Sequence, residues 1–218
     1  MDFDFSEVQE MLRKDARRLL TEKCPKSYVR KMEELQDYSM DFDPEMKFED
    51  FSKEFIIKLL HEYARSYILI DGLWSTEITQ KHGDAVARDC DLAVWLRIEE
   101  IIYPRIAKIL NIQVKDVLDV LKTWQLAPDG YKQDYYDIEL DVKNSNHVIW
   151  TTKRCGMLSY FERKAPEKIA SVCHDMEQPI MQKIFGIFNP DMRVKLLKLP
   201  PRKSPDEIAC QFEFKLEV

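Results

Sequence analysis

Residues 55–74 read FIIKLLHEYARSYILIDGLW and form the most apolar stretch of the sequence. Apolar side chains recur in it every three or four residues, which is the spacing of one helix face. Further apolar residues fill the positions between them, and a helix that is apolar on more than one side is normally covered by several neighbours. The sequence therefore predicts a central, buried helix that is capped at its start by Ser52. The residues expected in the core around it are Tyr63, Tyr67, Ile70, Trp74 and Trp95.

The composition is that of an ordinary globular protein, and it excludes several functional classes. The 218 residues carry a formal net charge of −6, which argues against nucleic-acid binding because that function needs a basic face. The phosphate-binding patterns G-x-G-x-x-G and G-x-x-x-x-G-K do not occur. No apolar run reaches the ~20 residues that span a bilayer, and the acidic start of the chain does not resemble a signal peptide. We therefore expect a cytoplasmic protein that binds neither nucleic acid nor membrane.

Four segments are expected along the chain. Residues 1–36 are predicted to form an N-terminal helical arm of two helices, the second over residues 28–35. The acidic, turn-rich residues 37–51 are typical of a linker. Residues 52–127 are predicted as a helical core, with a second long helix over residues 84–110 that Pro104 should kink. Residues 128–218 are predicted as a separate α+β sheet subdomain.

After Gly130 the apolar period changes from helical to two, which indicates strands with one wet face. Strands are predicted over residues 136–143, 147–152, 192–199 and 208–216. Pro166 is expected to open one helix between the second and third strands, and Pro179 to bend or split it. The predicted fold is α+β, with a helical N-terminal half packed on a C-terminal four-stranded antiparallel sheet and one crossing helix (β-β-α-β-β).

Asp71 is the one carboxylate placed late in the apolar helix. A buried carboxylate is costly unless it is paired, so we expect a donor from Arg65, Arg88 or a backbone cap. One interpretation makes Asp71 a polar anchor or general base in a pocket that Tyr67 and Trp74 line. The other is that Asp71-Gly72 marks a helix break, because both residue types favour caps and breaks.

Three of the five cysteines, Cys155, Cys173 and Cys210, are predicted to face the gap between the helix and the sheet. Simple packing, a reactive or ligand-contacting thiol with Cys173 as nucleophile, and a metal site are all compatible with this placement. The sequence has no C-x-x-C pair, and His174 points away from its neighbour Cys173 on a helix. We therefore predict no metal and no cofactor, and we expect the cysteines to be reduced.

These candidates meet in one predicted pocket at the junction of helices and sheet, where ligand sites commonly lie. Asp71, as a candidate base, and Cys173, as a candidate nucleophile, are expected there. The residues predicted to contact a small-molecule ligand are Tyr67, Trp74, Cys155 and Cys210.

Asp71-Gly72-Leu73-Trp74, followed by Gly83, Trp95 and the segment Cys210-Gln211-Phe212-Glu213-Phe214, carries a family resemblance. The chain is similar to the L-2-amino-thiazoline-4-carboxylic acid hydrolase-like proteins and, more distantly, to vinyl-reductase-like small-molecule-binding domains. The family pattern has an aromatic residue after the tryptophan and a glutamate four residues before the glycine. Ser75 and Thr79 occupy those positions here, so a catalytic or metal role of that glutamate is not carried over.

Residues 2–20, DFDFSEVQEMLRKDARRLL, resemble the first helix of acyl-CoA dehydrogenases. The resemblance is confined to residues 1–36, and the flavin-binding sheet and catalytic carboxylate of that family have no counterpart. It implies neither dehydrogenase activity nor a flavin.

Three functions are compatible with these features. The first is a small-molecule-binding protein with its pocket between the helical half and the sheet. The second is a cysteine-dependent hydrolase of a small cyclic amino-acid-like substrate. The third is an accessory or assembly protein that docks on a larger enzyme, or on a second copy of itself, through residues 1–36.

Overall fold

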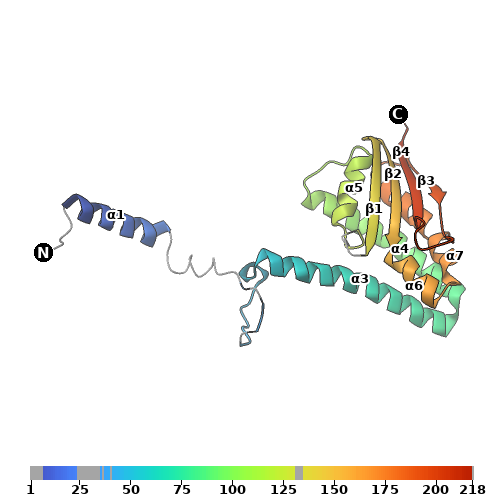
Figure 1. The fold of residues 1–218 in the computed structure, drawn as a ribbon, viewed down its shortest axis with the longest axis horizontal. Coiled ribbons are helices and arrows are strands. Elements are labelled where there is room, and N and C mark those ends of the chain that lie inside the picture. Colours follow the sequence, from blue (N-terminus) through green and yellow to red (C-terminus); the bar gives the residue numbers. More distant parts are fainter. Residues whose placement is uncertain (1–6, 24–34, 36, 40, 131–134, 218) are drawn as a thin grey trace. The chain divides into compact units, whose positions relative to one another are not determined.

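The computed structural model describes residues 7–23, 35, 37–39, 41–130 and 135–217. The chain divides into two compact units, residues 1–60 and 61–218, and the boundary lies inside helix α3 (Lys53–His82). The labels are those of Figure 1.

The first unit contains helix α1 (Glu7–Lys23), the short 3₁₀ helix η1 (Phe48–Asp50) and the beginning of α3. The backbone amide of Phe55 donates to Ser52 Oγ at 3.1 Å, so the predicted cap at Ser52 is confirmed. Leu35 forms an isolated parallel bridge with Phe51. The rest of the helix predicted over residues 28–35 lies outside the described residues.

In the second unit, Gly83 joins α3 to helix α4 (Asp84–Ile109). Its φ of 88° is a left-handed conformation that glycine adopts without strain. Helix α4 continues through Pro104, close to the bounds predicted for it. Helix α5 (Val117–Leu126) begins at Asp116, whose side chain accepts from the amide of Asp119 at 2.9 Å.

The sheet contains β1 (Tyr136–Asn144), β2 (His147–Cys155), β3 (Met192–Lys198) and β4 (Cys210–Leu216). Its order is β1-β2-β4-β3 and every neighbouring pair is antiparallel (Figure 1). Val148, Trp150 and Thr152 are buried at alternate positions of β2. The α+β prediction and the strands read from the period of two are therefore confirmed.

The single crossing helix predicted between β2 and β3 is wrong in detail, because the chain forms three helices there. These are α6 (Gly156–Lys164), α7 (Lys168–Cys173) and α8 (Glu177–Phe188). Helix α6 was missed; it starts where Cys155 Sγ accepts from the amide of Leu158 at 3.4 Å. Pro179 lies in the first turn of α8, where backbone amides have no partner within the helix, so it fits there without bending it.

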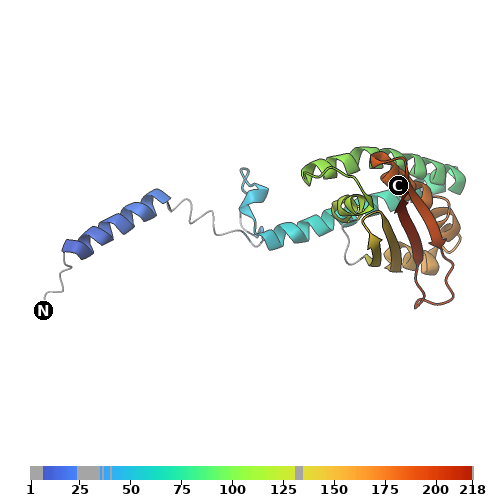
Figure 2. The same cartoon turned by 90° about the horizontal axis from the view of Figure 1, so that it is seen from above.

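Helices α4, α5 and α8 cover one face of the sheet, and Figure 2 shows α4 running along that side. Tyr103, Val120 and Ile184 from these helices share one buried cluster with Phe212 and Phe214 from β4. The predicted boundary at residue 127 therefore does not separate two compact units, since helices and strands bury their apolar faces against each other.

The prediction that α3 is a central helix buried on several sides is wrong. Tyr63, Ile70 and Trp74 are 54%, 68% and 65% exposed. The stripe of α3 that is covered instead runs through Ala64, which is buried, and Asp71, which is half-buried. The apolar pattern is present all round the helix, but only the stripe that carries the carboxylate meets neighbouring elements.

Replacing Trp74 by alanine should therefore change the free energy of unfolding by no more than about 0.5 kcal/mol, which is the usual range for an exposed site. An exposed side chain leaves no cavity when it is truncated. Urea unfolding of Trp74→Ala beside the wild type measures this difference. A loss of several kcal/mol would show that Trp74 is covered in solution.

Candidate functional site

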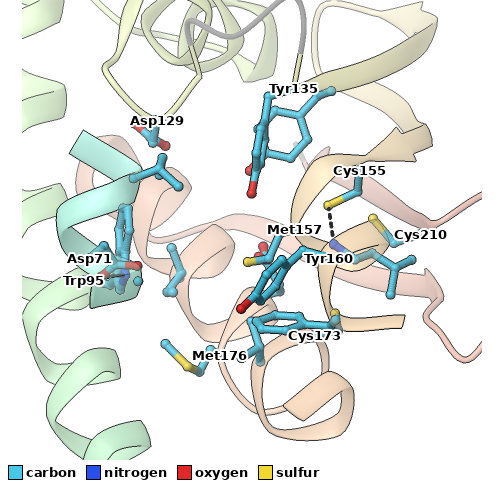
Figure 3. A pocket seen from close by; sticks show the side chains of 18 of the residues that line it. Asp71, Trp95, Asp129, Tyr135, Cys155, Met157, Tyr160, Cys173, Met176 and Cys210 are labelled. Atoms are coloured by element: carbon cyan, nitrogen blue, oxygen red, sulfur yellow. Dashed lines mark hydrogen bonds between the residues drawn. The ribbon is translucent and has the colours of Figure 1, made fainter. Parts of the chain in front are cut away.

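The second unit contains a cavity of about 820 Å³ that is lined by residues of helices α3 to α8 and of the sheet. Figure 3 shows Asp71 and Trp95 on one side of it and Cys155 and Cys210 on the opposite side. Most of the wall is apolar or aromatic, and it is interrupted by acidic groups that include Asp71 of α3 and Asp91 and Glu99 of α4. The side of α3 and α4 carries carboxyl groups, whereas the opposite side carries thiols.

Asp71 accepts a hydrogen bond from Trp95, which the sequence did not suggest as its donor. Trp95 Nε1 of α4 donates to Asp71 Oδ1 at 3.1 Å, and the Trp95 ring meets Tyr67 edge-on at 5.9 Å. Arg88, one of the predicted donors, pairs with Asp89 and Asp175. Helix α3 runs without interruption through Gly72, so the interpretation of Asp71-Gly72 as a helix break is wrong.

Asp91 lies one helical turn before Trp95 and hydrogen-bonds to Asp71. Burial raises the pKa of Asp91, while hydrogen bonds with Asp71, Ser75 and Trp95 lower it in part. Two carboxyl groups hydrogen-bond to each other only when one of them carries a proton. The pair can therefore hold or release a proton at the cavity wall.

Glu99 lies one turn beyond Trp95 on the same stripe of α4 and is only 1% exposed. Its Oε1 atom has no hydrogen-bond partner among the described residues. Burial, reinforced by the negative charge of Asp129, raises the pKa of Glu99 to about 9. Glu99 is therefore a neutral carboxylic acid at pH 7.

Asp129 belongs to the turn that follows α5. The amide of Gly130 donates to the carbonyl of Ala127 at 3.0 Å, and a Cβ at Gly130 would lie 1.8 Å from the carbonyl oxygen of Trp124. Only glycine fits so close to that backbone, which fixes the turn. The hydroxyl of Tyr103 donates to Asp129 Oδ2 at 3.2 Å.

The three cysteines line the opposite wall, where Cys155 ends β2, Cys173 ends α7 and Cys210 begins β4. Burial raises the pKa of Cys155 to about 11 and that of Cys210 to about 12. The pKa of Cys173 is also raised, first by burial and then by the nearby charge of Glu177. All three are protonated thiols near neutral pH, and a thiol is a much weaker nucleophile than a thiolate.

The imidazole of His174 is not placed to activate these thiols. His174 is exposed, and its Nε2 atom donates to the carbonyl oxygen of Pro200 at 2.6 Å. Within the described residues, no group of three or more histidine, cysteine or acidic side chains has a geometry that would hold a metal ion.

Iodoacetamide at pH 7.5 should therefore modify Cys90 well before Cys155, Cys173 or Cys210. Cys90 is exposed, whereas the three cavity thiols are protonated and buried or half-buried. Peptide mass spectrometry over a time course measures the four rates. Rapid modification of Cys173 ahead of Cys90 would contradict this assignment and favour a nucleophilic role.

The structure thus brings together four of the six predicted site residues on one cavity, namely Asp71, Cys155, Cys173 and Cys210. Trp74 lies on the exposed side of α3, and Tyr67 contacts the ring of Trp95 but does not line the cavity. Whether any of them contacts a ligand stays a prediction.

Asp91 and Glu99 were not predicted as site residues, although their spacing in the sequence indicates that they share one helix face with Trp95. Asp91, Trp95, Glu99 and Tyr103 follow one another at intervals of four and so lie on one stripe of α4. Two acids on the same helix face as a tryptophan and a tyrosine are unusual for a solvated stripe. Asp129 gave no such signal, because a turn aspartate is common.

In the described residues no helix is both long enough and apolar enough to cross a bilayer. A model of a family of unknown function (DUF6125) matches residues 49–216. No curated protein and no solved structure shows significant similarity to the chain. The function must therefore be inferred from the cavity.

Proposed function

The chain belongs to the DUF6125 family of unknown function, and from this premise we propose that it binds a small molecule in the cavity between its helices and its sheet. The observation that carries the proposal is the cavity of about 820 Å³, whose apolar and aromatic walls are interrupted by a few convergent acids. Cavities of ~300–1,000 Å³ with such walls are typical of ligand sites.

Several features favour a binder over the cysteine-dependent hydrolase. The raised pKa values of Cys155 and Cys210 leave little thiolate at pH 7, and the pKa of Cys173 is raised as well. A nucleophilic cysteine normally has a base within hydrogen-bond reach, whereas His174 is bonded to a backbone carbonyl. The thiols are better suited to apolar contact with a ligand.

The docking function of residues 1–36 and the kinship with the hydrolase-like and vinyl-reductase-like proteins stay predictions. On α1, Met11 and Leu19 are 56% and 60% exposed, as a docking helix would require. Exposed apolar side chains on one helix do not identify a partner, so the cavity remains the stronger basis for a function.

Nile red, a neutral dye whose fluorescence rises in apolar surroundings, tests the proposal. We expect saturable binding of one dye per chain to the wild type. Val172 lines the cavity, so Val172→Trp should remove most of this binding by filling the space. Trp74→Ser, on the exposed face of α3, is the matched control and should leave the saturable binding unchanged.

The far-ultraviolet circular dichroism of both variants establishes that they fold. Binding that survives Val172→Trp but disappears in Trp74→Ser would place the dye on the surface of α3. That result would refute the proposed cavity site.

A further inference from the structure

We propose that the ligand of this cavity is an organic amine, bound as its ammonium ion beside Glu99 and Asp129 with its apolar body toward the cysteine wall. The inference rests on the proposed function and adds the chemical class of the ligand. It is carried by the burial of Glu99 and by the charges and aromatic rings of the wall.

Glu99 supplies the observation that points to a ligand. Its side chain lines the cavity, is 1% exposed, and has an Oε1 atom without a hydrogen-bond partner among the described residues. A buried polar atom without a partner is energetically costly, so such atoms are rare unless something binds them. A donor group on a ligand in the cavity would satisfy it.

The charge of the cavity wall indicates the sign of the charge on that ligand. Of the residues that the structure describes, five acidic side chains line the cavity, at Asp71, Asp91, Glu99, Asp129 and Glu177. The described basic side chains on the same wall are those of Arg65 and Lys168, together with His61. Arg65 pairs with Glu62 at 3.7 Å and its side chain is 64% exposed, so its charge is well screened by solvent. Glu99 is protonated and Asp71 and Asp91 share a proton, so the negative charge of this wall is that of Asp129, Glu177 and one carboxylate of the Asp71–Asp91 pair. Lys168 and the screened Arg65 offset only part of it, so the wall favours a cation over an anion.

The aromatic rings fit the same ligand class. Trp95, Trp124, Trp150, Tyr135 and Tyr160 line the cavity. Burial raises the pKa of Tyr135 to about 12, so its ring is neutral at pH 7. Faces of neutral aromatic rings attract a desolvated cation and also accept an apolar body. An amine with an aryl or alkyl chain would use both properties.

Binding should be linked to a proton on Glu99. Among the described residues, the groups that interact with this carboxyl are Asp129 from the turn after α5, Tyr67 from α3 and Tyr103 from α4 itself. None of these groups carries a positive charge. An ammonium ion placed there favours the carboxylate over the acid, so the proton of Glu99 leaves to solvent as the amine binds.

The probe pair is 4-phenylbutylamine and its neutral analogue 4-phenylbutanol, titrated calorimetrically at pH 7.0. We expect the amine to bind at least tenfold more tightly than the alcohol. Repeating the titration in phosphate and in Tris, whose ionisation enthalpies differ, gives the number of protons exchanged. We expect release approaching one proton per amine and none for the alcohol.

Glu99→Gln keeps the shape of the protonated side chain but cannot ionise. It should weaken amine binding by at least tenfold, leave alcohol binding unchanged, and abolish proton release. Glu100→Gln is the matched control, because Glu100 is exposed, pairs with Lys183 and does not line the cavity. It should bind both probes as the wild type does.

Equal binding of alcohol and amine, or amine binding without proton release, would overturn the inference while leaving the cavity as a binding site. The second of these results would indicate that Glu99 stays protonated and donates to a ligand acceptor. Failure of both probes in a protein that still binds Nile red would likewise overturn the amine assignment alone. Failure of all three compounds would refute the proposed function itself.

Discussion

Phe214→Ala should lower the free energy of unfolding by about 3–5 kcal/mol, as truncation of a fully buried phenylalanine usually does. Phe214 is 0% exposed in the middle of β4. Its ring stacks on Phe185 of α8 at 4.5 Å and meets Trp150 of β2 edge-on at 5.8 Å. Alanine there removes apolar contacts with both layers and leaves a cavity that the strand and helix cannot close.

Chemical unfolding followed by fluorescence measures the loss. Lys215→Ala is the control, because the neighbouring side chain is exposed and should change stability by less than about 0.5 kcal/mol. The stability of Phe214→Leu should lie between those of Phe214→Ala and Lys215→Ala, since leucine retains most of the buried volume. A Phe214→Ala variant as stable as the wild type would show that the sheet and α8 are not packed as described.

Glu99→Gln should stabilise the protein, and the gain should grow as the pH rises from about 5 to 8. The pKa of Glu99 is about 9 in the folded protein, compared with 4.5 for an ordinary glutamate. Below pH 4.5 the Glu99 carboxyl is protonated in both the folded and the unfolded protein, so its ionisation has no effect on stability. Between these two values the unfolded chain ionises while the folded protein keeps its proton.

The folded state therefore binds more protons than the unfolded state, and stability decreases with pH across this window. The decrease attributable to Glu99 is at most about 1.4 kcal/mol per pH unit. Asp91, whose pKa is also raised, acts in the same direction. Glutamine cannot ionise, so the substitution removes the contribution of Glu99 and leaves that of Asp91.

Urea unfolding at pH 4.5, 6, 7 and 8 tests this linkage. We expect the two proteins to have similar stability at pH 4.5 and the variant to be more stable by a few kcal/mol at pH 7. The Glu100→Gln protein should follow the wild type at every pH. Parallel curves for Glu99→Gln and the wild type would mean that the Glu99 carboxyl is hydrated in the folded protein.

Local patterns were sufficient for most of the secondary structure. The alternation at Val148, Trp150 and Thr152 depends only on which side of a strand faces the core, so it can be read from the sequence. The bounds of α4 follow in the same way from Gly83 and a helical period. Helix α6 was missed because its beginning relies on the sulfur of Cys155 as a cap, for which no common sequence signature exists.

Part of the candidate site could also be predicted from local patterns. Asp71 and the three cysteines were placed at the junction of helices and sheet because each lies at a position of a periodic element that faces inward. Glu99 was not predicted as a site residue, because a glutamate in a helix is normally solvated. Its burial depends on which elements surround α4. Its pKa is a property of that surrounding and not of the residue type.

The sequence by itself determined the class of the fold, the strands, the long helices and the absence of phosphate-binding loops, since these depend on periodicity and residue type. Only the tertiary structure decided which stripe of α3 is covered. An apolar pattern around the whole helix leaves that choice open, and the neighbours cover the stripe with Asp71 while Trp74 stays exposed. Likewise, the proximity of Glu99 to Asp129 depends on packing between α4 and the turn after α5, which no local pattern encodes.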